Sequence, residues 1–414
     1  MNEKKRVVVT GFGAVTALGM NVSDIWTEIM AGKTGIKNLT CFDTTEYSTR
    51  IGAEVDNDKL AQRLADIKFK RYDRTVEMAI VSCEQALKHA GLIGDGPDYN
   101  PQRIATIIGT GVGSAHSLFH AYNCFFEKKV RGMRPTTVPR CMANATSAQV
   151  SMKFRLTGTN YMITCACASS TVAIGESFRM IADGYENIVL CGGSDAIFEP
   201  ASYASWNNLG VMSKNPDPLK ACRPFADDRD GCVLGEGSAA LLLESLESAQ
   251  SRKATILGEI VGYGASSDAE HITRPSPEGQ ANAIRNALSS AEISAAEIGF
   301  VNAHGTATRA NDECESASIL NALGSSADDT PVSALKSYFG HLLGASGAME
   351  TIITILCLQK NILPPNLNLE NRDPNCHLCL VGNTPTETNA SYALKNSFGF
   401  GGTNAVLVIR KWHD

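Results

Sequence analysis

Short runs of β-branched and other apolar residues alternate with helix-like patterns along the whole chain. Residues 6–10 and 104–108 are two such runs, and a glycine follows each of them. Between these runs, apolar side chains recur at helical spacing over residues 76–90. Strand-like runs separated by helices are typical of α/β proteins whose sheets are largely buried. The sequence therefore predicts an α/β fold.

The second half of the chain repeats features of the first. The matching pairs are residues 6–13 with 256–263, residues 104–108 with 300–303, the segment after Cys167 with 347–358, and Gly192-Gly193 with Gly401-Gly402 and the run 405–409. Patterns of this kind also look alike by chance, so the comparison leaves internal duplication open. Residues 244–251 read as a polar helix end, which predicts two halves, residues 1–250 and 251–414.

Composition excludes several classes of protein. The most apolar helix candidate, residues 348–358, is far shorter than the roughly 20 residues that cross a bilayer, so we expect no membrane span. The charged N-terminus has no long apolar run after it, so we expect no signal peptide. A net charge of −6 gives no reason to expect nucleic acid as a partner. The thirteen cysteines lack the spacing of a disulfide scaffold, which favours a reducing, cytoplasmic location.

Cys167 is the candidate nucleophile. It ends the apolar run 161–167, and small residues follow it before a helix-like segment at 171–183. A cysteine at a strand-to-helix turn lies at the positive end of the helix dipole, so we expect its thiol pKa to be lowered. Cys165 competes for the role, because strand alternation would bury or expose both side chains alike. Only Cys167 lies at the turn; the alternative is a pair of buried structural thiols.

Two histidines lie in similar glycine-rich turns downstream. His304 ends an apolar strand in the segment 301–308, and His341 lies in the segment 336–347, five residues after Lys336. Imidazole can transfer a proton near neutral pH or donate to a thioester carbonyl. A histidine that merely caps a strand end is the alternative for His304, but a second one in so similar a setting makes coincidence less plausible.

The turn at residues 396–404 is the fourth candidate element. Glycines flank Phe400 on both sides, so its backbone has unusual freedom and its ring can swing. Such a loop can supply an oxyanion N–H and a movable gate. A tight turn before the last strand is the alternative.

Other motifs are weak. Gly11-Phe-Gly13 is followed by Thr16 where a dinucleotide-binding fingerprint has its third glycine, and Gly109-Thr-Gly-Val-Gly113 lacks the ending of a phosphate loop. A zinc site on Cys165, Cys167 and a histidine lacks paired Cys-x-x-Cys spacing. We therefore expect no metal.

The motifs together resemble those of the β-ketoacyl-acyl carrier protein synthases, closest to the elongating, type II-like enzymes of fatty-acid synthesis. The resemblance covers essentially the whole chain and includes residues 7–11, 229–231, 234–237 and 398–404. It implies the thiolase fold, with two similar halves stacked as five α-β-α-β-α layers, usually in a homodimer. It also implies a catalytic triad formed by Cys167, His304 and His341.

The same resemblance implies the remaining roles. Cys167 would accept an acyl group from an acyl carrier protein, and malonyl-acyl carrier protein would then lose carbon dioxide and extend that group by two carbons. This decarboxylative Claisen condensation needs no cofactor. The implied site residues are Lys336 and Glu315 as organisers of the site, the N–H groups of Cys167 and Phe400 as the oxyanion hole, Phe400 as the gate, Thr306 and Thr308 on pantetheine, Val112 in the acyl pocket, and Gly401 at the substrate.

An acidic carrier protein needs local basic surface on its partner. Two clusters qualify, Lys68, Lys70, Arg71 and Arg74, and Lys128, Lys129, Arg131 and Arg134. A solvated helix face explains either cluster about as well.

One segment departs from the housekeeping pattern. Residues 308–312 look more like ketosynthase subunits of type II polyketide systems, whereas the ending at Asn404 matches the fatty-acid branch. A specialised polyketide or polyene ketosynthase, paired with a chain-length-factor-like partner in a heterodimer, is therefore the alternative. A degradative thiolase is disfavoured, because the turn at 399–402 offers no second catalytic cysteine, and a non-catalytic subunit is disfavoured by the intact triad.

Overall fold

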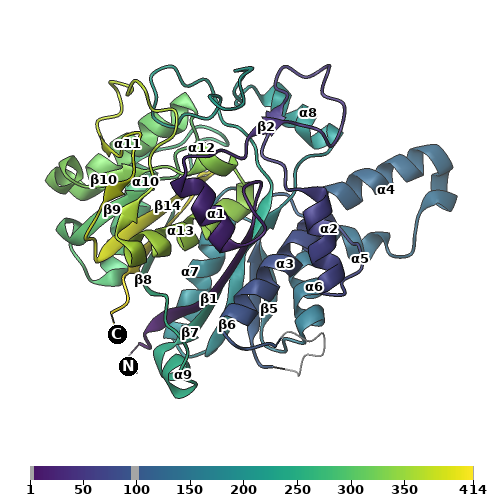
Figure 1. The fold of residues 1–414 in the computed structure, drawn as a ribbon, viewed down its shortest axis with the longest axis horizontal. Helices are drawn as coiled ribbons and strands as arrows, with labels where there is room; N and C mark the ends of the chain where they lie inside the picture. Colours follow the sequence, from purple (N-terminus) through teal and green to yellow (C-terminus); the bar gives the residue numbers. More distant parts are fainter. Residues whose placement is uncertain (1–3, 95–101, 414) are drawn as a thin grey trace.

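One large mixed sheet organises the molecule (Figure 1). The computed structural model describes residues 4–94 and 102–413. Eleven strands within these ranges form the sheet, in the spatial order β12 (Cys379–Leu380), β10 (Pro331–Ser333), β9 (Ile298–Asn302), β14 (Tyr392–Gly399), β15 (Thr403–Arg410), β8 (Gly258–Ser267), β1 (Val7–Val15), β7 (Gly237–Ser245), β6 (Ile188–Asp195), β4 (Ala105–Gly109) and β5 (Asn160–Ile163).

The two halves of this sheet have the same topology. In each half the first strand pairs antiparallel with the last, the last pairs antiparallel with the fourth, and the second and third follow in parallel. The spatial order β1-β7-β6-β4-β5 is thus repeated by β8-β15-β14-β9-β10. The halves join through a three-pair antiparallel ladder between β1 and β8.

Three of the four segment pairs matched in the sequence are structurally equivalent, and one is not. Gly192 and Gly193 lie inside β6, whose counterpart is β14, whereas the run 405–409 lies in β15, the counterpart of β7. This match was wrong. A glycine pair beside an apolar run can lie in the turn before a strand or within the strand itself, and the sequence does not distinguish the two.

Helices separate and cover the two half-sheets. In the N-terminal half, α3 (Arg74–His89) packs on β1 and β7, and α6 (Ala145–Phe154) packs on α3. In the C-terminal half, α10 (Pro277–Ala291) packs on β8 and β15, with α11 (Arg309–Leu323) beside it. Between the half-sheets lie α7 (Ser169–Ala182) and α13 (Ser346–Lys360), which contact each other (Figure 1). This is the five-layered thiolase fold, and the prediction is confirmed.

Glycines make the outer helices fit in the same way in both halves. A Cβ atom on Gly11 or Gly13 of β1 would collide with the backbone of α3, and one on Gly262 or Gly264 of β8 would collide with that of α10. Hydrogen takes the place of a side chain so that helix and strand backbones approach closely.

The remaining elements decorate this core. They are the helices α1 (Val22–Met30), α2 (Asn57–Asp66), α4 (Ala115–Lys128), α5 (Thr137–Cys141), α8 (Pro200–Leu209), α9 (Leu246–Ser251) and α12 (Lys336–Phe339), the 3₁₀ turns η1 (Lys129–Gly132), η2 (Ala295–Glu297), η3 (Gly324–Asp328) and η4 (Leu343–Ala345), and the small pairs β2 (Lys37–Asn38) with β3 (Ile51–Gly52) and β11 (Ile362–Leu363) with β13 (Thr386–Glu387).

Helix α4 projects from the body of the molecule (Figure 1). It and the segment after it expose large apolar side chains, among them Tyr122, Phe126, Val130 and Val138. Large exposed apolar groups of this kind mark interaction surfaces. Among the described residues, no helix has both the length and the apolar character that a membrane span requires.

Candidate active site

Cys167 lies in the turn that connects β5 to α7. The strand ends at Ile163, and the helix begins at Ser169. Ala166 has a φ of 47°, which bends the chain sharply before the thiol. The Ser169 hydroxyl braces this bend: it donates to the carbonyl oxygen of Ala166 at 2.6 Å and accepts from the N–H of Cys165 at 2.8 Å. Cys167 is buried and Cys165 only half-buried, because neither residue belongs to the strand whose alternation would have made them alike.

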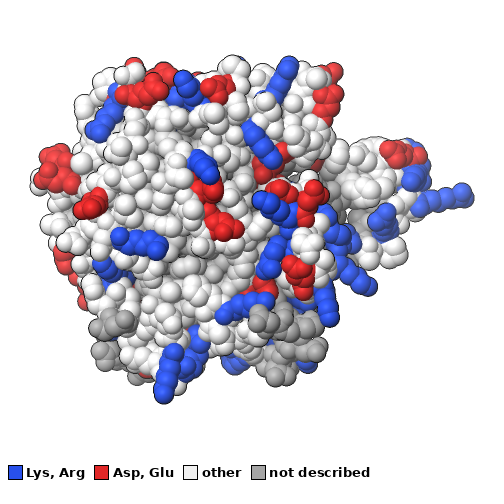
Figure 2. Space-filling view, in the orientation of Figure 1, with Lys and Arg blue, Asp and Glu red and all other residues white. Residues whose placement is uncertain are grey.

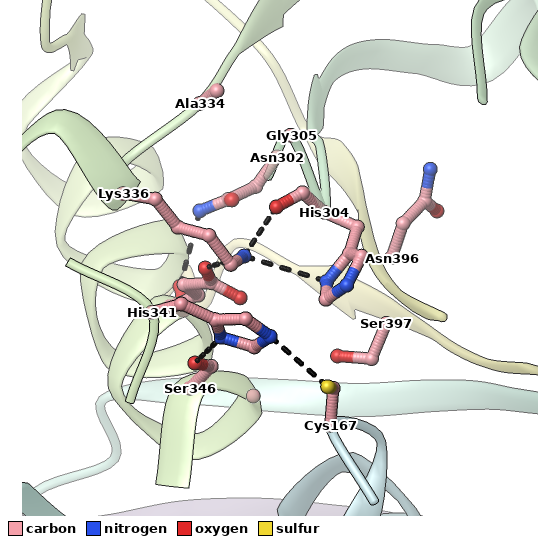
Figure 3. A network of polar contacts seen from close by, with 12 residues as sticks. Cys167, Asn302, His304, Gly305, Ala334, Lys336, His341, Ser346, Asn396 and Ser397 are labelled. Atoms are coloured by element: carbon pink, nitrogen blue, oxygen red, sulfur yellow. Dashed lines mark hydrogen bonds and ion pairs between the residues drawn. The ribbon is translucent and has the colours of Figure 1, made fainter. Parts of the chain in front are cut away.

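His341 contacts the thiol directly. Its Nε2 atom lies 3.0 Å from Sγ of Cys167, and its Nδ1 atom lies 3.0 Å from Oγ of Ser346 (Figure 3). The backbone of His341 is fixed by the N-terminal half, since its N–H donates to the carbonyl oxygen of Val233 at 2.7 Å. Contacts at both ring nitrogens and at the backbone therefore fix the position of the His341 side chain.

His304 completes the cluster from the end of β9. Its ring centroid lies 5.4 Å from that of His341, and the ligand-type atoms of Cys167, His304 and His341 all lie within 4.8 Å of one another. Glu315 holds the turn, because its carboxylate accepts the backbone N–H groups of His304 at 2.7 Å and Gly305 at 2.8 Å. The structure thus brings together the three side chains that the sequence singled out.

Lys336 fixes the tautomer of His304. Its ammonium donates to the His304 carbonyl oxygen and lies 3.4 Å from Nδ1 (Figure 3). An ammonium has only donors, so Nδ1 accepts and the ring proton resides on Nε2. Since Nδ1 faces Lys336, the proton on Nε2 is available to a substrate carbonyl.

The electrostatics of the site differ from the sequence expectation for the thiol. Burial raises the pKa of Cys167 to about 11, while the charge of Lys336 and the backbone N–H of Phe400 act in the opposite direction. The expected lowering of the pKa by the dipole of α7 was wrong for the resting enzyme, because removing a thiolate from water outweighs it.

Both histidines are neutral. Burial and the positive charge of Lys336 hold the pKa values of His304 and His341 well below the ordinary value of 6.5. A neutral imidazole at 3.0 Å from a thiol can accept its proton during attack. The resting pair is therefore thiol and imidazole, an arrangement that allows proton transfer from Cys167 to His341.

Two further charged groups, which contact Lys336 directly or through each other, were not singled out from the sequence. The side chains of Glu350 on α13 and Lys395 on β14 are completely buried, as is that of Lys336. Glu350 bridges the two lysines, at 2.7 Å from Lys336 and 2.8 Å from Lys395. A charged residue inside an otherwise apolar helix or strand was the available signal, since such residues are almost never fully buried without a partner.

A cavity of about 730 Å³, its open mouth included, leads to the thiol. Its lining includes Cys167, His304, His341, Thr306, Thr308, Phe398, Phe400 and the mouth segment 271–275. Phe400 stacks on Trp206, with ring centroids 6.0 Å apart. The hydroxyl groups of Thr306 and Thr308 lie 2.8 Å apart.

Two expected substrate-binding residues, both within the described ranges, lie outside this lining. Val112 is 44% exposed on the loop after β4, where its N–H donates to Asp195 at 3.1 Å. Gly401 is exposed, and its N–H donates to the carbonyl oxygen of Ile272 at 2.7 Å, which ties the turn of Phe400 to the mouth of the cavity.

The cluster of one thiol and two imidazoles is also a set of zinc ligands. The ammonium of Lys336, 3.4 Å from Nδ1 of His304, disfavours a second cation at this place. The donor set fits proton transfer better than metal binding.

Comparisons with known proteins agree with this geometry. The family described as Beta-ketoacyl synthase, N-terminal domain matches residues 4–249, and its C-terminal domain matches residues 257–370. The chain is 40% identical over 413 residues to a 3-oxoacyl-[acyl-carrier-protein] synthase 2 from Synechocystis sp., covering 99% of both chains, and 39% identical over 415 residues to its namesake from Coxiella burnetii, covering all of both.

Three solved structures of similar proteins each align with 99% of this chain and with the whole of their own chain. The ishigamide ketosynthase/chain length factor has a TM-score of 0.90 at 33% identity, and a beta-ketoacyl synthase from Burkholderia phymatum has 0.88 at 34%. A type II polyketide ketosynthase in complex with its acyl-carrier protein has 0.91 at 29%. By sequence, fold and the residues around Cys167, the chain belongs to the β-ketoacyl synthase family.

Proposed function

We propose that this protein is an elongating β-ketoacyl-acyl carrier protein synthase, an acyltransferase that extends a carrier-bound chain by two carbons. The observation that carries the proposal is the 3.0 Å contact between Cys167 Sγ and His341 Nε2, with His304 alongside, at the base of an open cavity. The relatives named as 3-oxoacyl synthases support the reaction type.

In the first half-reaction, Sγ of Cys167 attacks the carbonyl carbon of an acyl thioester on the carrier's pantetheine arm. His341 accepts the thiol proton and returns it to the departing pantetheine sulfur as that C–S bond breaks. The N–H groups of Cys167 and Phe400 hold the oxyanion of the tetrahedral intermediate. The N–H of Phe400 is among the groups that lower the pKa of Cys167, which supports its assignment as a donor at the reaction site.

In the second half-reaction, malonyl-acyl carrier protein enters past Thr306 and Thr308. Its carboxylate carbon leaves as carbon dioxide, and the electron pair becomes an enolate whose oxygen accepts from Nε2–H of His304. His341 adds a second donor at Nε2 once its ring proton has moved there from Nδ1, which faces Ser346. The enolate carbon attacks the acyl group on Cys167, a C–C bond forms, and the C–S bond to Cys167 breaks. One proton taken up from solvent restores the thiol. Decarboxylation provides the driving force, so no nucleotide or redox cofactor takes part.

The acyl carrier protein is the proposed macromolecular partner, and the two basic clusters differ in how many of their cations already form ion pairs. Arg71 and Arg74 are already engaged with Glu77 and Glu236, at 2.8 and 2.5 Å. The four residues of the second cluster, from Lys128 to Arg134, are all exposed along the projecting arm of α4 and η1 (Figure 2). We propose this second cluster as the docking surface. Charge reversal at Lys128 and Lys129 should raise KM for the carrier substrate, and an unchanged KM would exclude the cluster.

Mass spectrometry of the intact protein, followed by peptide mapping, tests the proposed reaction directly. Incubation with acyl-carrier protein should add one acyl group to the peptide that contains Cys167, and malonyl-carrier protein should then remove it as the 3-oxoacyl product. Cys165→Ser is the matched control, because it alters a neighbouring thiol and should leave acylation intact. Acylation at any other residue, or none, contradicts the proposal.

A polyketide or polyene ketosynthase is the second candidate. The segment 308–312 favours it, as does the similarity to the ishigamide ketosynthase/chain length factor. In that case the exposed apolar surface around α4 would bind a chain-length-factor-like subunit instead of a second copy. Size-exclusion chromatography with the elongation assay separates the two: a homodimer that elongates alone supports fatty-acid synthesis, and a chain that needs a homologous partner supports the alternative.

We also propose that the protein acts in the cytoplasm. All thirteen cysteines lie within the described ranges and are free thiols, which fits a reducing compartment.

Finally, we propose that the halves divide at residue 250 into 1–250 and 251–414, of which residues 1–3, 95–101 and 414 lie outside the described ranges. The nucleophile then belongs to one half and both histidines to the other.

A further inference from the structure

Lys395 is a buried lysine that the mechanism above does not use. It lies on β14, and its side chain has no exposed surface. Its ammonium donates to the carbonyl oxygen of Asn396 at 2.6 Å and lies 2.8 Å from Oε2 of Glu350. Neighbouring strands and α13 enclose it, so every contact it makes is with the protein.

Glu350 connects Lys395 to the reacting groups. Its other oxygen, Oε1, lies 2.7 Å from Nζ of Lys336, and Lys336 in turn contacts the carbonyl oxygen and Nδ1 of His304 (Figure 3). One chain of polar contacts therefore runs from Lys395 through Glu350 and Lys336 to His304. By contrast, the Cys167–His341 contact does not pass through Glu350.

Lys336 alone already balances the charge of Glu350. The second buried carboxylate nearby, Glu315, accepts from the backbone N–H groups of His304 and Gly305 and from Asn396, so Lys395 is not its direct partner. An apolar side chain at position 395 would avoid the cost of burying a second ammonium. Burial lowers the pKa of Lys395, while the Glu350 carboxylate acts in the opposite direction. A costly cation kept next to a pair that could be neutral points to a role in orienting that pair.

We propose that Lys395 is a positioning residue for the malonyl half-reaction, which holds Oε2 of Glu350 so that Oε1 stays on Lys336 and Lys336 stays on His304. The inference rests on the proposed function. Without Lys395, the carboxylate can turn fully toward Lys336 and draw the ammonium away from Nδ1, so that His304 loses its fixed tautomer.

Lys395 also contributes to the potential at the histidines. Its charge is among the causes that lower the pKa of both His304 and His341, after burial and Lys336. The charged or titratable groups around the two rings are Cys167, Asp195, Glu315, Lys336, Glu350 and Lys395. Lys395 reaches His304 only through Glu350 and Lys336, so its removal reports on positioning and on charge without deleting a direct contact with either ring.

The first variant removes the charge of Lys395 and keeps a side chain of similar volume. Lys395→Met should lower kcat for malonyl decarboxylation about tenfold, with KM for malonyl-carrier protein and the rate of Cys167 acylation within about threefold of wild type. Removing a positive charge raises the pKa of the histidines, so the acidic limb of the pH–rate profile should move to higher pH.

Two further variants separate positioning from charge and from stability. Lys395→Gln offers Glu350 an amide donor in place of the ion pair at 2.8 Å, so it should recover much of kcat while its acidic limb stays displaced. Thr354→Val is the matched control on α13: it removes a buried hydroxyl that donates to the carbonyl oxygen of Glu350 at 2.7 Å and carries no charge. It should lower stability and leave the limb in place.

A double-mutant cycle provides the sharpest test. Glu350→Gln leaves two ammonium groups facing each other without a carboxylate, so adding Lys395→Met to it should restore decarboxylation several-fold, although Lys395→Met alone is harmful. Additive losses would overturn the proposal, as would a Lys395→Met enzyme with wild-type rate and pH profile. Failure of both Lys395 variants to fold would assign the residue to stability and also overturn it. A wild-type protein that does not condense at all would instead refute the proposed function.

Discussion

The Sγ atom of Cys167 and the Nε2 atom of His341 lie 3.0 Å apart, although the two residues come from opposite halves of a duplicated fold. Burial keeps the thiol protonated and the imidazole neutral. The pair is thus arranged for proton transfer at the moment of attack, and the following expectations depend on it.

Replacing Cys167 by alanine should abolish condensation, with a loss of at least about 1,000-fold, because no acyl-enzyme can form. Malonyl decarboxylation should persist, since His304, His341 and Lys336 remain in place. Release of carbon dioxide and formation of the 3-oxoacyl product are measured in the same samples. A Cys167→Ala enzyme that still elongates would show that the nucleophile is misassigned, and Cys165 would then be tested.

Acylation of Cys167 should stay fast at pH values below 6.5. The pKa of His341 in the folded protein is well below that value, so the imidazole remains a proton acceptor in mildly acidic solution. The acylation rate should fall only as the pH drops through the lowered pKa. Stopped-flow or quenched-flow acylation from pH 5 to 8 gives the profile; a midpoint at the ordinary value of 6.5 would contradict the buried, neutral assignment.

The same two histidines should make stability depend on pH. Each has a lowered pKa when folded, so the unfolded chain binds more protons below its ordinary pKa of 6.5. The contribution is fully present above 6.5 and is lost as the pH falls below it, at up to about 1.4 kcal/mol per pH unit for each histidine. Urea unfolding of wild type and of His341→Asn should show a shallower slope for the variant in this window.

Thr306→Val should weaken binding of the carrier's arm and spare the chemistry. Its hydroxyl lines the cavity and pairs with Thr308 at 2.8 Å, so its loss removes one hydrogen-bonding group from the path to the thiol. We expect KM to rise about five- to tenfold, equivalent to about 1 kcal/mol, with kcat within about twofold. A large fall in kcat at unchanged KM would place Thr306 in the chemical step instead.

Arg229 should be essential to stability and not to chemistry. Its buried guanidinium forms an ion pair with Asp373 and lies 3.4 Å from Asp312, whose pKa burial raises to about 6. Arg229→Met leaves both carboxylates without a cation, at an expected cost of about 3–5 kcal/mol in the free energy of unfolding. The exposed Arg309→Met is the control and should change it by less than about 1 kcal/mol.

The sequence predicted the fold class and the members of the reactive cluster because both depend on local pattern. Alternating apolar runs predict strands and helices; Cys167 and His304 each end such a run, and His341 lies in a glycine-rich turn. The pKa of Cys167 could not be predicted in this way, since it depends on how deeply the assembled halves bury the sulfur. The pairing of Glu350 with Lys395 escaped for the same reason: the two lie far apart in the sequence, and only the stacking of α13 on β14 brings them together.

The short ladder between β1 and β8 has a functional consequence. Since the sulfur is anchored on one side of this junction and His304 on the other, a slight slip of one repeat past the other would separate the thiol from His304 while each repeat kept its own internal hydrogen bonds. The turnover rate should therefore respond to a shift at the junction between β1 and β8 more sensitively than the melting temperature does.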